Sequence, residues 1–285
     1  MYPIWMASDG SGRGDARRVT SRTFFRVRVA ALLAILVGVL LYALADWQTR
    51  RARNDWKSTL VVGLVVLRLG PVDDVAVTSL RERVRALEDV LAGEAARYEG
   101  RERARRPFDV EVFGPVDVTE RPPALEGTGL VDLARYTLAK RRYIGLVDQA
   151  AKVETGLDAR IYLVAREGHT GGTNFVEGVS EDGGRTGFVE VDLDETMVDF
   201  ALFVFAHELF HTLGATDKYD ASGHALVPAG LAEPNLVPQF PQRYAELMAR
   251  ARPVAPGREV PPDRLDELRV GEMTATEIGW RAQAP

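Results

Sequence analysis

Two histidines, His207 and His211, stand four residues apart in the segment VFAHELFHTLGATDKYD, which covers residues 204–220. An α-helix turns by about 100° per residue, so side chains four residues apart project from the same face, one turn apart. Two imidazoles in that arrangement can bind the same metal ion. The chain contains no cysteine, so the other ligands of such an ion must also be nitrogen or oxygen atoms. The spacing therefore predicts half of a zinc site on a helix.

Glu208 directly follows the first of these histidines. Its carboxylate is too close to its own helix to reach the same ion comfortably, but it can reach a water molecule bound to that ion. A carboxylate in this position can take a proton from the water. We therefore predict that Glu208 is a general base and not a metal ligand.

A third protein ligand must come from outside the helix, because a catalytic zinc ion has three protein ligands and one open position. Gly214 tolerates a positive φ angle, so it can end the helix and let the chain turn back under the metal. Asp217 follows His207 by ten residues, where a returning chain can offer its carboxylate. Asp217 is our candidate third ligand, although Asp217 and Asp220 could instead cap a turn or bind calcium.

The resulting order, HExxHxxGxxD, resembles the metzincin zinc-peptidase motif HExxHxxGxxH with aspartate in place of the third histidine, the form found in snapalysin-like secreted peptidases. The DKYD continuation is similar to the motif of immune-inhibitor-A-like metallopeptidases. Metzincins also have a methionine-containing turn beneath the metal. Met248, at the end of the segment Ala245-Glu246-Leu247-Met248, is the candidate here, and this segment is similar to the ELM of snapalysin. The resemblance is confined to the C-terminal part of the chain.

This resemblance implies an α+β fold of the zincin type, with a twisted sheet and an active-site helix, and the activity of a zinc-dependent endopeptidase. It implies that His207, His211 and Asp217 bind Zn²⁺. Glu208 would take a proton from water and later deliver it to the leaving amine. The substrate would be a peptide or protein that pairs antiparallel with an edge strand of the sheet.

Three points at the site are open. In the gluzincin class of peptidases the third ligand is a downstream glutamate, and Glu233 or Glu246 could have that role. Tyr219 either packs against the domain or brings its hydroxyl to the site. The chain could also be a membrane-tethered binding protein with a zincin fold and an idle or structural metal. The presence of Glu208 disfavours this last interpretation, because a protein that does no chemistry has no need of a general base.

The composition excludes other kinds of site. A chain of 285 residues with 46% apolar composition can bury a full core. The absence of cysteine excludes disulfides and thiolate nucleophiles. Residues 1–28 hold six arginines against two aspartates, and the whole chain has a formal charge of −5, so the remainder carries −9. This charge argues against nucleic acid as a partner.

The N-terminal part of the chain predicts a membrane anchor. A basic tail at residues 1–28 precedes seventeen uncharged residues, VAALLAILVGVLLYALA, at residues 29–45. At about 1.5 Å per residue this run covers most of a 30 Å hydrocarbon layer. The arginines before it favour an N-terminus inside and a catalytic domain outside the membrane. Cleavage after Ala45, at the AxA-like site Ala43-Leu44-Ala45, would instead make the domain secreted. The run is longer than a usual signal core, which favours an uncleaved anchor.

Residues 46–57 are predicted to be a juxtamembrane linker, and residues 58–285 an extracytoplasmic domain in which helices and strands alternate. The apolar residues Met197, Val198 and 200–206 predict that the metal helix is buried. His169 and His224 are predicted to lie in surface loops. Hydrophobic spacing and turn residues predict the other elements: strands at 59–69, 108–113 and 159–165, helices at 77–98 and 130–153, and a hairpin with strands at 175–179 and 187–193 around Asp182-Gly183.

Phe188 and Val189 of this hairpin are our candidates for the strand nearest the substrate. The methionine turn is predicted within residues 242–252. A closing helix is predicted at residues 265–280. Four of its side chains are expected to pack on the core: Leu268, Met273, Ile278 and Trp280.

Overall fold

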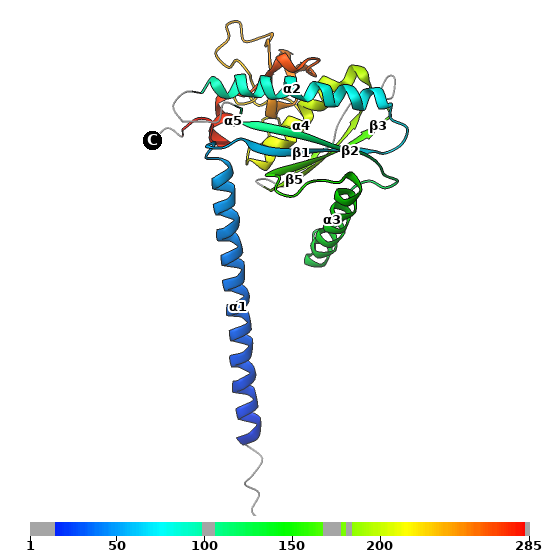
Figure 1. Cartoon of the computed structure of the whole chain (residues 1–285). Helices are drawn as coiled ribbons and strands as arrows, with labels where there is room; N and C mark the ends of the chain where they lie inside the picture. The colour runs from blue at the N-terminus through cyan, green and yellow to red at the C-terminus, as the bar shows by residue number, and fades with distance from the viewer. Residues whose placement is uncertain (1–14, 99–105, 168–177, 181–183, 283–285) are drawn as a thin grey trace, which may run out of the picture. The chain divides into compact units, whose positions relative to one another are not determined.

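A computed structural model of the chain describes residues 15–98, 106–167, 178–180 and 184–282 (Figure 1). The chain forms two compact units, Met1–Arg51 and Ala52–Pro285. His169, the Asp182-Gly183 step and most of the strand predicted at 175–179 lie outside the described residues, as does the first half of the predicted basic tail.

The first unit consists of helix α1 (Asp15–Arg53), whose end belongs to the second unit. Within α1, Thr23–Leu44 is long and apolar enough to cross a membrane, and it is exposed throughout; a signal sequence near an N-terminus has the same properties. This segment begins earlier than the predicted span at residues 29–45. It includes Arg26 and Arg28, whose long side chains can extend to a polar layer.

The predicted linker at residues 46–57 is ordered at its C-terminal end. Helix α1 continues to Arg53, whose guanidinium donates a hydrogen bond to the Gly184 carbonyl over 2.9 Å. The Trp56 side chain is buried, and its indole nitrogen donates to the Ile278 carbonyl over 2.7 Å. The domain therefore starts before the predicted residue 58. The large indole of Trp56 buries much apolar surface when it packs in the core, which stabilises the fold.

The second unit is built on a five-stranded sheet in which the first four strands are parallel and the last is an antiparallel edge strand. The spatial order is β2 (Phe108–Asp117), β1 (Leu60–Arg68), β3 (Ala159–Arg166), β5 (Thr186–Asp192) and β4 (Gly178–Ser180). The strands predicted at 59–69, 108–113, 159–165 and 187–193 are confirmed. Strand β2 continues past residue 113 because Val116 and Asp117 pair with the end of β1.

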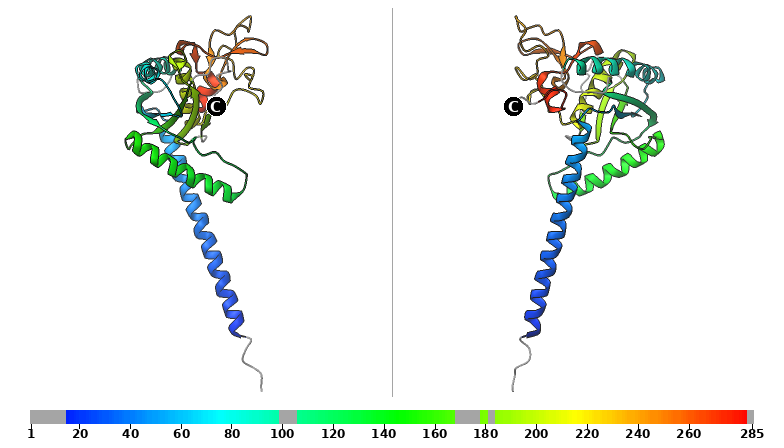
Figure 2. Two further views of the ribbon diagram at one scale, coloured as in Figure 1. Left: turned by 90° about the vertical axis from the view of Figure 1, so that its right-hand side faces the viewer. Right: turned by 60° about the vertical axis from the view of Figure 1, so that its left-hand side comes forward.

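Helices cover both faces of this sheet. Helices α2 (Asp74–Ala96) and α4 (Val198–Thr212) lie on one face, and α3 (Leu130–Ala151) lies on the other (Figure 2). Alternate residues of each strand point to opposite faces of the sheet. Leu64 and Leu163 join the large core with α2 and α4, whereas Val65 and Tyr162 pack with Val147 of α3. The predicted fold is thus confirmed at the level of a mixed α and β domain with a sheet and a buried helix that carries the histidines.

The predicted hairpin does supply the edge strand, but Phe188 and Val189 are not on it. Both belong to β5, which lies inside the sheet, and β4 is the edge strand. Phe188 stacks on Tyr162 at 4.8 Å on the side of the sheet that α3 covers, away from α4, whereas Val189 belongs to the core on the side of α4. Sequence alone could not show which strand of the hairpin lies at the edge of the sheet. In the structure it is the first strand, β4.

After α4 the chain forms short elements. Strand β6 (Ala245–Glu246) pairs with β9 (Leu268–Arg269), and β7 (Arg252–Ala255) pairs with β8 (Arg258–Val260). The predicted closing helix at 265–280 is wrong as one element. The pairing of β9 divides it into η3 (Leu265–Glu267), β9 and α5 (Glu272–Glu277). Leu268, Ile278 and Trp280 are buried as predicted, but Met273 is 51% exposed.

Four aromatic side chains join the ends of this domain to its centre. Trp280 packs edge-on against both Trp56 and Phe210, at 5.6 and 5.5 Å between ring centroids, and Trp56 packs against Phe108 at 5.5 Å. Edge-to-face pairs add about 0.5–1.5 kcal/mol each beyond the burial of their surface. The cluster fixes the last turns of α4 to both ends of the domain.

Replacing Phe210 with alanine should lower the free energy of unfolding by about 3–5 kcal/mol, because the buried ring leaves a cavity that its aromatic neighbours cannot fill. Urea denaturation of the full chain in detergent, followed by tryptophan fluorescence, measures the loss. Met273→Ala is the control, since this exposed side chain should change the stability by no more than about 0.5 kcal/mol. Equal losses in the two variants would contradict the packing described.

Candidate metal centre

Helix α4 carries His207, Glu208 and His211 in its last two turns, and all three side chains are buried or nearly so. Gly214 ends this helix with φ at +93°, as predicted. Its amide donates to the His211 carbonyl over 2.9 Å, and the Ala215 amide donates to the Phe210 carbonyl over 3.1 Å. This pair of bonds is a Schellman motif, which satisfies the last carbonyls of the helix and turns the chain back.

Both imidazoles are oriented by backbone carbonyls. His207 Nδ1 lies 2.9 Å from the Leu247 carbonyl oxygen, and His211 Nδ1 lies 2.9 Å from that of Ala215. A carbonyl oxygen can only accept, so each Nδ1 must carry the hydrogen. The Nε2 lone pair of each neutral ring is then free to bind a metal ion, and the ring is held in the orientation that presents it.

Asp217 completes a triangle of donor atoms. Its Oδ1 lies 3.3 Å from His207 Nε2 and 3.2 Å from His211 Nε2, and the two Nε2 atoms are 3.1 Å apart. Ligands that share one tetrahedral zinc ion at about 2.0–2.1 Å are about 3.3 Å from one another. The structure therefore brings the three predicted ligands to the mutual distances that one zinc ion requires.

The chemistry of these atoms also fits a cation. Three lone-pair donors so close together repel one another unless a positive charge lies among them, either a proton on an imidazole or a metal ion. Burial lowers the pKa of His211, but the hydrogen bond to Asp217 and the charges of Glu208 and Asp217 outweigh burial and raise it. Burial raises the pKa of Asp217, yet the two imidazoles hold it well below its usual range. The site thus attracts positive charge.

Glu208 belongs to the same cluster. One ligand atom from each of His207, Glu208 and His211 lies within 4.8 Å of the others, so this group can hold a metal ion. In this group of three, Glu208 would be the third ligand in place of Asp217. We prefer Asp217 as the third donor because its oxygen is within 3.3 Å of both Nε2 atoms. Glu208 is then left beside the triangle.

Tyr219 lies next to this triangle. Its ring faces that of His207 with 6.4 Å between centroids, and the Arg250 guanidinium lies 4.8 Å above it. Burial and the charge of Asp217 raise the pKa of Tyr219 to about 12. The hydroxyl therefore keeps its proton at neutral pH and can act only as a neutral donor or acceptor. The ring of Tyr219 thus packs beside the site, and a role for its hydroxyl stays a prediction.

The predicted methionine turn is the 3₁₀ turn η2 (Leu247–Ala249), and Met248 is buried within it. The backbone of this turn supports the site twice. The Leu247 carbonyl accepts from His207, and the Met248 carbonyl accepts from the Lys218 amide over 2.8 Å. The turn thus connects the first histidine to the segment that carries Asp217.

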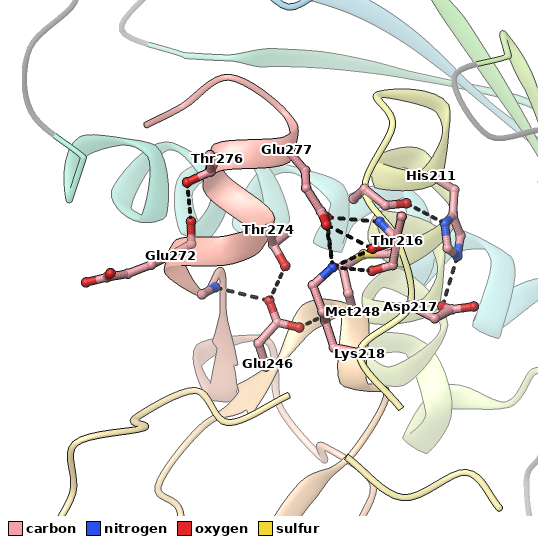
Figure 3. Close-up of polar contacts among 12 residues, drawn as sticks. His211, Thr216, Asp217, Lys218, Glu246, Met248, Glu272, Thr274, Thr276 and Glu277 are labelled. Carbon is pink, nitrogen blue, oxygen red and sulfur yellow. Dashed lines mark hydrogen bonds and ion pairs between the residues drawn. The ribbon is translucent and has the colours of Figure 1, made fainter. Parts of the chain in front are cut away.

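Helix α5 holds the same segment from the other side (Figure 3). The Glu277 carboxylate accepts from the Thr216 amide at 3.0 Å, from the Thr216 hydroxyl at 2.9 Å, and from the Lys218 ammonium at 2.8 Å. Lys218 is buried, and its ammonium also bonds to the Thr216 carbonyl. One carboxylate therefore fixes the residues on both sides of Asp217. We call this set, Thr216, Lys218 and Glu277, the Glu277 clamp.

Replacing Glu277 with glutamine should lower the free energy of unfolding by about 1–3 kcal/mol, because Lys218 stays buried without its counter-charge. The affinity for Zn²⁺ should fall by about tenfold, since groups that orient a ligand typically contribute that much or more. Chelator competition measures the affinity, and urea denaturation the stability. The control is Glu272→Gln, on the same helix but with an exposed ion pair to Arg281. Unchanged zinc affinity in Glu277→Gln would contradict the clamp.

The alternative ligands are engaged elsewhere. Glu246 is buried and accepts from the Thr274 hydroxyl at 2.7 Å, the Met248 amide at 2.6 Å and the Gly271 amide at 3.1 Å (Figure 3). Glu233 forms an ion pair with Arg243. Asp220 caps a turn by accepting from the Ser222 and His224 amides.

His224 is exposed, as predicted. Because Asp220 accepts from the Ser222 and His224 amides, Asp220 and not Asp217 caps the turn. Calcium binding by Asp217 or Asp220 stays an alternative prediction.

The Glu277 clamp is the part of the site that sequence reasoning missed. Glu277 lies sixty-one residues after Thr216, and its contacts depend on how α5 packs. The one available signal was Lys218, a lysine inside the motif, since a buried lysine requires an anionic partner.

No protein-family model matches this chain, and no curated protein matches it. Among solved structures, the crystal structure of archaemetzincin from Methanopyrus kandleri is similar over 58% of this chain and 78% of that one, with 18% sequence identity and a TM-score of 0.31. A likeness at this level carries no conclusion about fold or activity. The metal centre rests on its own geometry.

Proposed function

We propose that this chain is a membrane-anchored, zinc-dependent endopeptidase. The observation that carries the proposal is the triangle formed by His207 Nε2, His211 Nε2 and Asp217 Oδ1, with sides of 3.1–3.3 Å. Three protein ligands from one helix and the loop behind it are typical of a catalytic zinc site, whereas structural sites use four. The sequence order HExxHxxGxxD, which resembles that of metzincins, supports the same function.

In this proposal His207, His211 and Asp217 hold the zinc ion, which supplies Lewis acidity to activate water and polarise the scissile carbonyl. Glu208 accepts the proton of the attacking water at its carboxylate and returns it to the leaving amine. The carbonyls of Leu247 and Ala215 keep both imidazoles in the required tautomer.

The substrate strand would pair with an edge of the sheet. Strand β4 is the described edge next to β5, and it runs antiparallel to the other strands. A peptide that adds to this edge would supply backbone hydrogen bonds, which depend little on its side chains. We therefore propose an extended peptide or an unfolded protein segment as the substrate.

The membrane anchor is the second part of the proposal. It is supported by Thr23–Leu44 of α1 and by the arginines that precede the predicted span. The basic tail would lie inside, and the domain from residue 58 onward, with the ordered residues just before it, would lie outside the membrane. If the segment is removed after Ala45, the same domain is secreted.

The test is casein hydrolysis by the purified full chain in detergent. We expect hydrolysis that 1,10-phenanthroline abolishes and that one equivalent of Zn²⁺ restores. Hydrolysis that survives the chelator would contradict a metal-dependent mechanism. Stoichiometric zinc binding without hydrolysis of casein or unstructured peptides would favour the binding protein with an idle metal.

A further inference from the structure

Helix α3 exposes an apolar and basic face that no described part of the domain covers. Leu138 is 70% exposed and Leu146 is 61% exposed on this face. Leu130, in the first turn, is 86% exposed but lies about 160° around the helix from Leu146, outside this face. Two leucines this exposed on one side of a helix form an apolar patch with their neighbours, and exposed apolar patches usually mark an interaction surface. We call this surface the α3 face.

Arginines lie on the same face. Arg135, Leu138, Arg142 and Leu146 follow one another three or four residues apart, so they form one exposed stripe. Arg141 is exposed at the edge of this stripe. Between residues 133 and 147 the helix has no acidic residue. This is unusual in a chain whose part after residue 28 carries −9. The positive charge is therefore concentrated on the face that also exposes the leucines.

The acidic residues of α3 do not offset this charge. Asp148 faces the sheet, where it bonds to the Tyr162 hydroxyl at 2.7 Å and pairs with Arg160. Asp132 accepts from the Gly129 amide at the first turn of the helix. The opposite side of α3 is also where Val147 packs into the sheet. The helix is thus fixed on one side, and the α3 face is directed away from the sheet.

We propose that the α3 face lies on an anionic lipid surface. Exposed leucines interspersed with arginines are typical of helices that rest in the interface of a bilayer, with the apolar side chains among the acyl chains and the arginines at anionic headgroups. Each basic residue near such a surface adds to the electrostatic attraction.

The proposed membrane anchor is covalently connected to the second unit, so a lipid surface is always close to this unit. The apolar segment of α1 ends at Leu44, and the second unit begins at Ala52. The seven residues between them belong to helix α1 and span about 10 Å, at about 1.5 Å per residue. A domain tethered so closely must turn some face to the bilayer, and the inference therefore rests on the proposed anchor. A second copy is a poorer partner, because symmetric pairing would place the arginines of the two faces against one another.

This arrangement has a consequence for the metal centre. Helices α3 and α4 lie on opposite faces of the sheet (Figure 2). Contact of the α3 face with lipid would therefore leave the helix that carries His207 and His211 on the side away from the bilayer. Substrates outside the membrane could then reach the site without displacing lipid.

The absence of cysteine allows a direct test with one introduced cysteine in the full chain. Leu138→Cys is labelled with the fluorophore NBD, and Glu82→Cys, at an exposed position on α2, is the matched control. The proteins are reconstituted into phosphatidylcholine vesicles with or without phosphatidylglycerol, and nitroxide-labelled lipids serve as quenchers. We expect several-fold stronger quenching at position 138 than at position 82 when phosphatidylglycerol is present. Combined Arg135→Gln, Arg141→Gln and Arg142→Gln changes should remove that increase.

Each other outcome overturns the inference. Equal quenching at the two positions means that the α3 face lies in water. An NBD signal at position 138 that is shielded from water but not quenched by lipid means that a protein surface, from a second copy or another partner, covers it. A chain that does not float with the vesicles refutes the anchor and the docking together. Casein hydrolysis measured on the same samples reports separately on the proposed peptidase.

Discussion

Glu208→Gln is expected to lower kcat/KM for peptide hydrolysis by about 10²–10⁴-fold, the usual contribution of a general base. Glutamine keeps the shape and burial of Glu208 but cannot accept a proton at neutral pH. The bound zinc should remain at one ion per chain, because His207, His211 and Asp217 provide the donor triangle without Glu208.

The control for this variant is Glu195→Gln. Glu195 is an exposed glutamate just before α4, so its replacement should leave both zinc content and kcat/KM unchanged. Zinc content is measured by atomic absorption, and kcat/KM with a quenched fluorescent peptide. If Glu208→Gln loses its zinc, Glu208 is a ligand and not a base. If it keeps both zinc and full activity, the proposed mechanism is wrong.

The helix that carries the site could be predicted because its chemistry and its burial are both local in sequence. His207 and His211 share a face by helical periodicity alone, and Gly214 ends the helix with the positive φ that its residue type permits. The parallel strands were also predictable, since β1 and β3 are continuous apolar runs of the kind that a buried parallel sheet requires.

Contacts between distant segments were the part that sequence could not supply. Nothing local indicates that Glu277 bonds to Thr216 and Lys218, or that β9 interrupts the predicted closing helix by pairing with β6. The prediction that Phe188 lies nearest the substrate was wrong for the same reason. Period-two alternation tells which residues share a face of a strand, but not which neighbour the strand has or which helix covers that face.

The same distinction explains why the exposed leucines of α3 went unnoticed. Leucines at helical spacing predict a buried stripe, and part of α3 does pack on the sheet through Val147, Tyr143 and Ile144. Only coordinates show that Leu138 and Leu146 lie on the other side. A helix with apolar residues on two sides needs a second apolar environment, which the domain itself does not provide in its described residues.

Asp217→Ala is expected to weaken zinc binding by at least about 100-fold, because residues that merely orient ligands already contribute about 10–100-fold. The variant removes one corner of the donor triangle and leaves two imidazoles, which do not make a closed catalytic site. Peptide hydrolysis at low zinc should be lost with the metal. Asp217→His should recover part of the affinity, since an imidazole is the residue that metzincin-like motifs have at this position.

Asp220→Ala separates this effect from damage to the loop. Asp220 belongs to the same segment and caps a turn, but it makes no contact with His207 or His211 among the interactions described. Its loss should cost some local order and leave zinc affinity within about twofold, since only a backbone cap is removed. If Asp217→Ala binds zinc as tightly as the parent while Glu246→Gln or Glu233→Gln does not, the third ligand is a glutamate. The donor triangle would then be an ion pair between a carboxylate and a protonated histidine, with no part in holding the metal.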